Sequence, residues 1–315
     1  MMILLGSGYG FQAGTDSQVY CSVNEGVNVP KVASTHRPST KPKLGQHFLS
    51  SPEIAARIVD ALGDTSHGAV LEIGPGKGIL TSLLARRSRK LIAVELDRVL
   101  AAQLRLKFGM FANVEIIEAD VLSIDFDSLF GPKPGLSRPG IEIKPQPAKV
   151  VGNLPYYITS DILLRLFDYA KYFESIVIMV QREVAERIAA SPGSRDYGLL
   201  SATAQLYARV ENLFTVPPAA FTPPPKVHSS VLRLTMEPQQ EKLGVVGDGF
   251  IDFLRLSFGQ KRKTLWNNLK ETYAPADLRR ALSEAKVKES ARAETLSLEQ
   301  SAALYRALRR VQSGS

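Results

Sequence analysis

The chain has 315 residues, enough for one large domain and a small one, and its 44% hydrophobic content is ordinary for a soluble globular protein. No apolar run approaches the roughly 18 residues that a membrane span needs, so the sequence argues against a membrane protein. The formal net charge of +8 favours a polyanionic partner. A single cysteine, Cys21, excludes an internal disulfide framework and suits a reducing compartment.

The N-terminal segment carries few folding signals. Its apolar start, Met1 to Leu5, is too short for a signal peptide, and the first Lys or Arg is Lys31. The segment also lacks the Arg-rich, amphipathic character of a transit peptide. We therefore expect residues 1–42 to be a disordered extension or an over-long start, and the protein to be cytoplasmic.

Strands alternate with helices through the next part of the chain. Residues 52–62 carry apolar side chains at helical spacing, with Ser50 or Ser51 available as the N-cap. The patterns predict strands at 69–73, 90–94, 114–117, 148–151 and 175–180, and helices at 79–87, 98–108, 159–167 and 183–190. This alternation is typical of an α/β fold with a parallel, doubly wound sheet.

Two composition shifts divide the chain further. Residues 131–147 are too rich in proline for a helix or central strand, and we interpret them as a surface insertion without chemistry. Residues 236–249 are polar and predict a linker. We therefore expect a first domain at 43–235 and a second domain at 250–315.

The second domain is expected to be small and entirely helical. Apolar side chains recur at helical spacing in 250–269, 276–285 and 298–311. Residues 251–315 hold 13 Lys and Arg against 7 Asp and Glu, so this short segment supplies most of the net charge.

A glycine-rich loop separates the strand at 69–73 from its helix. Gly74, Gly76 and Gly78 would let the backbone approach a ligand at the carboxyl edge of the sheet. Their spacing differs from the dinucleotide fingerprint, so a nucleoside-type cofactor is favoured over a pyrophosphate. A purely structural turn is the alternative.

Two carboxylates follow the next strands. Glu95 comes 21 positions after Gly74 and could accept hydrogen bonds from both ribose hydroxyls. Nearby Asp97 is less well placed, because Glu95 comes first after the apolar run. Asp120 follows the third strand, where it could accept from the adenine amino group of S-adenosylmethionine or, alternatively, cap a helix.

The tetrapeptide Asn153-Leu154-Pro155-Tyr156 offers what methylation of an aromatic amine requires. The N6 amine of adenine is a poor nucleophile, because its lone pair is delocalised into the ring. The Asn153 side-chain carbonyl and the Leu154 backbone carbonyl could accept its hydrogen bonds, while Tyr156 supplies a flat face for an unstacked base. A strand ending in an ordinary turn is the alternative. Neither a metal nor a covalent intermediate is implied.

The chain resembles the small-subunit ribosomal RNA adenine dimethyltransferase (KsgA) family from about residue 43 to 310. The resemblance rests on six ordered motifs and the glycine loop: 44–49, 74–78, 153–158, 181–187, 197–201, 221–231 and 260–265. It implies a Rossmann-like class I methyltransferase sheet with S-adenosylmethionine as cofactor. The cofactor contacts that we expect are His47, Leu49, Gly74, Gly76, Glu95, Asp120 and Asn153.

The resemblance also implies an adenine site. Phe221, in a proline-rich loop, would pack on the face of the flipped adenine opposite Tyr156, although it could instead be a core anchor. Tyr157 is expected to support packing rather than touch substrate. His47 departs from the Asn often found at its position in the family, but both side chains can donate one hydrogen bond, so cofactor binding is expected to survive.

A basic cluster is expected to bind RNA. Arg255, Lys261, Arg262 and Lys263 lie around a predicted helix in the second domain, and they could track phosphates or simply form a solvated face. Small-subunit rRNA, or a precursor of the small ribosomal subunit, is the expected partner of a monomeric protein.

The expected activity is transfer of methyl groups from S-adenosylmethionine to N6 of two adjacent adenosines in small-subunit rRNA, giving N6,N6-dimethyladenosine during ribosome biogenesis. Three alternatives remain at this point. They are a large-subunit rRNA methyltransferase of the antibiotic-resistance type, a non-catalytic ribosome-assembly or transcription factor, and a DNA adenine methyltransferase. The last is weakened because the chain has no further DNA-reading module.

Overall fold

The structure is a computed structural model that describes residues 47–131, 146–155, 157–247 and 249–313. Contacts between Cα atoms divide the chain into Met1–Leu44 and Gly45–Ser315, and every described residue belongs to the second unit. The predicted extension at 1–42 and most of the predicted insertion at 131–147 therefore lie outside the described residues.

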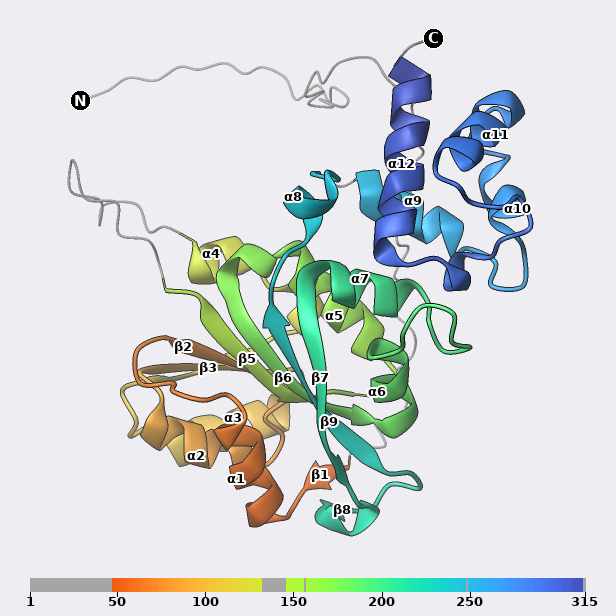
Figure 1. The fold of residues 1–315 in the computed structure, drawn as a ribbon. Coiled ribbons are helices and arrows are strands. Elements are labelled where there is room, and N and C mark those ends of the chain that lie inside the picture. The colour runs from red at the N-terminus through yellow and green to blue at the C-terminus, as the bar shows by residue number, and fades with distance from the viewer. Residues whose placement is uncertain (1–46, 132–145, 156, 248, 314–315) are drawn as a thin grey trace, which may run out of the picture. The chain divides into compact units, whose positions relative to one another are not determined.

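A seven-stranded sheet forms the centre of the described part (Figure 1). Its strand order is β4 (Val114–Glu118), β3 (Lys90–Glu95), β2 (Ala69–Ile73), β5 (Ala148–Asn153), β6 (Phe173–Gln181), β9 (Ser229–Met236) and β7 (Ala208–Val216). Strands β4 to β6 are parallel, as the alternation of strands and helices predicted.

The two last strands depart from the prediction of a wholly parallel sheet. β9 is antiparallel to both β6 and β7. Parallel neighbours need a crossover connection, whereas β7 and β9 follow each other in the chain through residues 217–228 and can pair as a hairpin-like unit. The sheet is therefore mixed, and mostly parallel.

Helices cover both faces of the sheet (Figure 1). One face packs against α1 (Pro52–Asp60) and α2 (Ile79–Arg87), the other against α5 (Thr159–Asp168), α6 (Arg182–Ile188) and α7 (Leu199–Tyr207). The remaining helices before residue 240 are α3 (Arg98–Phe108) and α4 (Phe126–Phe130). A hydrophobic cluster lies on each face of the sheet, and alternate side chains of β2 belong to different clusters. Leu71 and Ile73 pack in the cluster on the side of α5, α6 and α7, and Val70 packs in the cluster on the side of α1 and α2.

A separate two-stranded sheet lies near the end of the long strands (Figure 1). It pairs β1 (Phe48–Leu49) with β8 (Phe221–Thr222) in antiparallel register. The Ser50 amide donates to the Ala220 carbonyl at 2.8 Å, which extends this pairing. Segments about 170 residues apart in the chain are thus held together, a contact that the sequence did not predict.

Short helices make up the C-terminal part. They are α8 (Gln240–Leu243), α9 (Gly249–Ser257), α10 (Leu265–Leu269), α11 (Pro275–Glu284) and α12 (Leu298–Ser313). The expected linker at 236–249 contains α8 and two buried side chains, Leu243 and Val245. The hydrophobic cluster of these helices also includes Tyr197 and Leu206 from the region of α7.

The helical pattern at 250–269 was predicted as one stretch, and this was wrong. The structure interrupts it between Ser257 and Leu265, where the exposed residues 259–263 offer no apolar side chain to pack. Thr264 then caps α10, because its hydroxyl accepts a hydrogen bond from the Asn267 amide at 3.3 Å. Among the described residues, no helix is long and apolar enough to cross a membrane.

Candidate functional site

Three predicted site residues lie at the carboxyl ends of neighbouring parallel strands. Gly74 directly follows β2, Glu95 ends β3 and Asn153 ends β5, and these strands are adjacent in the order β3-β2-β5. Ligands of open α/β sheets bind outside this edge. The topology therefore brings the glycine loop, the acid and the amide to one place.

The glycine loop has a backbone that other residues would strain. Gly74, Gly76 and Gly78 have φ angles of +66°, +57° and +79°. A Cβ on Gly76 would lie 2.9 Å from a ring carbon of Phe48, and one on Gly78 would lie 2.8 Å from Phe108. The loop is thus packed closely under β1 on one side and α3 on the other.

Glu95 is buried and hydrogen-bonded to the backbone. Its side chain accepts from the Gly76 amide at 3.0 Å and from the Asp97 amide at 2.9 Å. Asp97 instead caps α3, accepting from the Val99 and Leu100 amides at 2.8 and 3.1 Å. Each carboxylate oxygen of Glu95 can accept more than one hydrogen bond, so these contacts leave room for ribose hydroxyls.

Asp120 takes the capping role that the sequence offered as an alternative. Its Oδ1 accepts from the Leu122 amide at 2.9 Å at the start of a short 3-10 helix, Val121–Ser123. The side chain is half-buried, and a carboxylate that caps a helix retains further acceptor positions. A contact with an adenine amino group stays a prediction.

Asn153 has an oriented side chain. Its Nδ2 donates to the main-chain carbonyl of His47 at 3.2 Å, which turns the side-chain carbonyl away from His47. Leu154 is buried, and its amide donates to the Met179 carbonyl of β6 at 3.1 Å. The Pro155 carbonyl accepts from the Thr159 hydroxyl at 3.1 Å, which ties the tetrapeptide to α5. Tyr156 lies outside the described residues.

Phe221 and Leu49 lie opposite each other in the pair of β1 and β8. Both are buried, at 3% and 6% exposed, in the cluster beneath α1. This is the core-anchor environment that the sequence left open for Phe221. Contact between its ring and a base remains a prediction, as does contact between Leu49 and a cofactor.

The ribosomal RNA adenine dimethylase family matches residues 37–310. The chain belongs to this family. It is 54% identical over 284 residues to ribosomal RNA small subunit methyltransferase A of Koribacter versatilis, covering 90% of this chain and 100% of that protein. It is 40% identical over 288 residues to the protein of the same name from Shouchella clausii, covering 89% and 94%.

Two solved structures share the fold of this rRNA adenine dimethylase family member. A dimethyladenosine transferase from Plasmodium falciparum superposes with a TM-score of 0.66 at 23% identity, covering 84% of this chain and 98% of that one. The 23S rRNA methyltransferase ErmE gives 0.58 at 28% identity, covering 83% and 99%. The predicted class I methyltransferase architecture is thereby confirmed.

The expectation that Tyr157 supports packing was wrong. The side chain is 59% exposed, beside the tetrapeptide. Tyr157 lies just before α5, where the Ile158 amide donates to the Pro155 carbonyl at 3.3 Å. Tyr157 therefore presents its ring to solvent next to the proposed adenine site.

Two residues beside the glycine loop, Phe48 and Glu72, were not among the predicted site residues. Phe48 occupies the space that a side chain on Gly76 would need, and Lys77 Nζ lies 4.9 Å from its ring centroid. Glu72 is fully buried in β2, and neither of its carboxylate oxygens has a hydrogen-bond partner among the described residues. An acid inside the apolar run 69–73 was a sequence signal for Glu72, and Phe48 lies within the family motif at 44–49.

Burial raises the pKa of Glu72 to about 7. The neighbouring Thr81 offsets part of this effect, and the Glu95 carboxylate adds to it. Glu72 precedes Gly74, the first residue of the glycine loop, by two positions.

The basic cluster is exposed, and most of it lies in a turn. Lys261, Arg262 and Lys263 connect α9 to α10 rather than lying on a helix, whereas Arg255 is on α9 and pairs with Asp252 at 2.9 Å. Lys261 Nζ donates to the Arg195 carbonyl at 2.7 Å. The structure thus brings the cluster beside the segment between α6 and α7.

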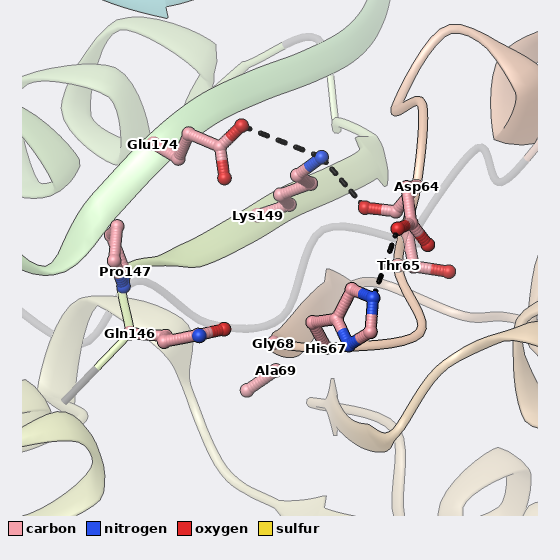
Figure 2. Close-up of a pocket in the computed structure, with 9 residues that line it drawn as sticks. All are labelled: Asp64, Thr65, His67, Gly68, Ala69, Gln146, Pro147, Lys149 and Glu174. Atoms are coloured by element: carbon pink, nitrogen blue, oxygen red, sulfur yellow. Dashed lines mark hydrogen bonds and ion pairs between the residues drawn. The ribbon is translucent and has the colours of Figure 1, made fainter.

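A pocket of about 520 Å³ lies at the opposite, amino edge of the sheet (Figure 2). Lys149 Nζ donates there to the carbonyls of Leu62 and Asp64 at 2.9 and 2.8 Å and pairs with Glu174 at 3.5 Å. No predicted site residue lines it. Within the described ranges, no group of three or more His, Cys, Asp or Glu side chains could hold a metal ion.

Proposed function

We propose that this protein transfers methyl groups from S-adenosylmethionine to N6 of two adjacent adenosines in small-subunit rRNA, giving N6,N6-dimethyladenosine. Membership of the rRNA adenine dimethylase family carries the proposal, together with curated relatives at 54% and 40% identity named for the small subunit. The oriented amide of Asn153 beside the glycine loop is the matching structural observation.

The carboxyl edge fits S-adenosylmethionine. The loop of left-handed glycines leaves no side chain between the backbone and a ligand, and the buried Glu95 lies at the end of the adjacent strand. Gly74, Gly76 and Glu95 would hold the cofactor, with Asp120, His47 and Leu49 around it. When bound, the cofactor supplies an electrophilic methyl group on a sulfonium.

Asn153 would orient the amine. Its Nδ2 donates to the His47 carbonyl, which leaves the acceptor Oδ1 facing the other side. With the Leu154 carbonyl, it would accept from the amine hydrogens and draw the nitrogen lone pair out of the ring. Proximity and alignment would then provide most of the rate enhancement.

The base and the RNA backbone would be held by separate surfaces. Tyr156 and Phe221 would clamp the flipped adenine. Arg255, Lys261, Arg262 and Lys263 are exposed and would contact rRNA phosphates, with residues 250–315 acting as an RNA-binding domain beside a methyltransferase domain at 43–235. We propose that the protein works as a monomer in the cytoplasm.

The test is methyl transfer from labelled S-adenosylmethionine to small ribosomal subunits that lack adenine dimethylation, followed by nucleoside analysis. Large subunits and duplex DNA serve as parallel substrates. We expect dimethyladenosine in the small subunit alone. Product in large subunits would instead favour the ErmE-like activity, and product in DNA would favour a DNA methyltransferase. Tight subunit binding without any product would indicate a non-catalytic assembly factor.

A further inference from the structure

One residue contacts both proposed halves of the adenine site. His47 lies one position before β1, and its main-chain carbonyl accepts from Asn153 Nδ2 at 3.2 Å. Its ring Nδ1 lies 2.8 Å from the Pro223 carbonyl, two residues after Phe221. The partners are 106 and 176 residues away in the chain.

Both hydrogen bonds have a main-chain carbonyl oxygen as their acceptor, which determines their direction. A main-chain carbonyl only accepts, so the ring must carry its hydrogen on Nδ1 to bond Pro223, and the amide must present its nitrogen to His47. A flipped Asn153 amide would place two acceptor oxygens against each other at this distance. The observed arrangement therefore permits one amide orientation, the one that leaves Oδ1 pointing elsewhere.

The main chain of Asn153 is held by the sheet. Asn153 pairs with Met179 of β6 at the end of β5, and the next amide, that of Leu154, donates to the Met179 carbonyl at 3.1 Å. The neighbouring glycine loop is covered at Gly76 by Phe48, the residue after His47. The sheet thus restrains the backbone of Asn153, and His47 restrains its side chain.

The ring of His47 determines where its carbonyl lies. The regular pairing of β1 with β8 begins only at Phe48, which pairs with Thr222. His47 precedes that ladder, and its bond to Pro223 continues the attachment by one residue. Loss of this bond would weaken the attachment of the residue whose carbonyl accepts from Asn153.

We propose that His47 is a positioning residue, whose ring bond to Pro223 places its own carbonyl so that the Asn153 amide is held in the orientation needed to accept from the target amine. This inference rests on the proposed function. It is additional to the proposed contact between His47 and the cofactor, because its effect passes through Asn153 and appears in the transfer step at saturating cofactor.

The test compares His47→Leu, which removes the donor, with His47→Asn, which retains an N–H donor on a shorter side chain. Single-turnover methyl transfer to small subunits is measured at saturating cofactor, and the Kd of S-adenosylmethionine is measured separately. We expect His47→Leu to lower the transfer rate at saturating cofactor about three- to tenfold, the equivalent of one hydrogen bond. The Kd reports the proposed cofactor contact of His47 separately, because saturation removes the effect of that contact on the rate. His47→Asn should recover most of the rate.

The chain offers a matched control in His67, an exposed histidine at the amino-edge pocket (Figure 2). His67→Leu makes the same chemical change away from the site and should transfer at the wild-type rate. A His47→Leu rate equal to wild type would overturn the proposal. So would a defect that disappears as cofactor is raised, which would indicate a cofactor contact.

A second readout does not depend on activity. The side-chain amide signals of Asn153 are assigned by their loss in Asn153→Ala, and their hydrogen exchange is followed in the full chain. Exchange should be about three- to tenfold faster in His47→Leu than in wild type and intermediate or slow in His47→Asn. Equal exchange in wild type and His47→Leu would refute the positioning role. Failure of wild type to methylate any substrate would refute the proposed function alone.

Discussion

Asn153 is the residue on which the proposed chemistry depends most directly. Asn153→Ala removes the acceptor for the amine and the hydrogen bond from the side-chain amide to the His47 carbonyl. It leaves the buried Leu154 and the glycine loop in place. We expect turnover to fall by about a thousandfold or more, comparable to loss of a key transition-state hydrogen bond. Small-subunit binding should be retained.

The measurement pairs single-turnover transfer with subunit binding for the same protein preparation. Asn113→Ala is a suitable control, since Asn113 also donates its side-chain amide to carbonyls, of Ala85 and Ser88, but at the other end of the parallel strands. Retained activity in Asn153→Ala would contradict the proposed amine geometry.

The raised pKa of Glu72 predicts that the free energy of unfolding depends on pH. Its pKa of about 7 in the folded protein is above the ordinary value of 4.5, because burial disfavours the charged form. The folded state therefore binds the proton more tightly than the unfolded state. The resulting stabilisation is complete below about pH 4.5 and is lost as pH rises through about 7.

Glu72→Gln should remove this dependence, because an amide does not titrate. Urea unfolding of both proteins without cofactor, from about pH 4.5 to 8, should show the free energy of unfolding of wild type falling relative to the variant by about 3 kcal/mol. A constant difference between the two proteins across this range would show that Glu72 does not titrate differently in the folded state.

At the scale of elements, the glycine loop requires both a left-handed backbone and a close neighbour. Gly76→Ala would impose a strained φ of +57° and a contact of 2.9 Å with Phe48. We expect cofactor affinity to fall about tenfold or more, because an αL alanine costs about 1 to 2 kcal/mol and Phe48 must also shift.

Gly193 is the matched control for that change. Its φ is +86° and no atom lies within 4 Å of a Cβ built on it, so Gly193→Ala carries only the backbone cost. It should destabilise the protein slightly and leave the Kd of S-adenosylmethionine unchanged. The Kd of S-adenosylmethionine is measured by calorimetry for both variants. If both bind cofactor like wild type, the loop does not hold the cofactor as proposed.

The pair of β1 and β8 is an element that the sequence motifs indicated only as two separate segments. It joins the residues before α1 to those after β7, and through His47 and Phe48 it contacts both Asn153 and the glycine loop. Two-residue strands have no periodicity to recognise. Their pairing depends on a partner about 170 residues away in the chain.

At the scale of the whole molecule, the basic cluster and the proposed methyl-transfer site lie on different elements. The exposed Lys261, Arg262 and Lys263 lie in the turn between α9 and α10, whereas the proposed methyl-transfer site is at the carboxyl edge of the sheet. Changing all three to Ala should weaken small-subunit binding and lower the slope of log Kd against log salt by about two to three.

The control variant removes the same number of positive charges at another place on the surface. Arg86, Arg87 and Arg89 are exposed at the C-terminal end of α2, towards the amino edge of the sheet. Their substitution by Ala should alter the salt slope much less. An unchanged slope in the Lys261, Arg262 and Lys263 variant would contradict the proposed RNA surface.

The amino-acid sequence by itself determined the α/β alternation, the glycine loop, the carboxylates after successive strands and Asn153 at the end of another. These features follow from local periodicity and from the rule that parallel strands share a carboxyl edge. The tertiary structure alone decided that β9 lies antiparallel beside β6, that the helical pattern at 250–269 breaks before Leu265, and that Tyr157 is exposed. It also decided that the side-chain amide of Asn153 donates to the carbonyl of His47, 106 residues away. Such contacts depend on which distant segments pack together, and no spacing within the chain encodes that directly.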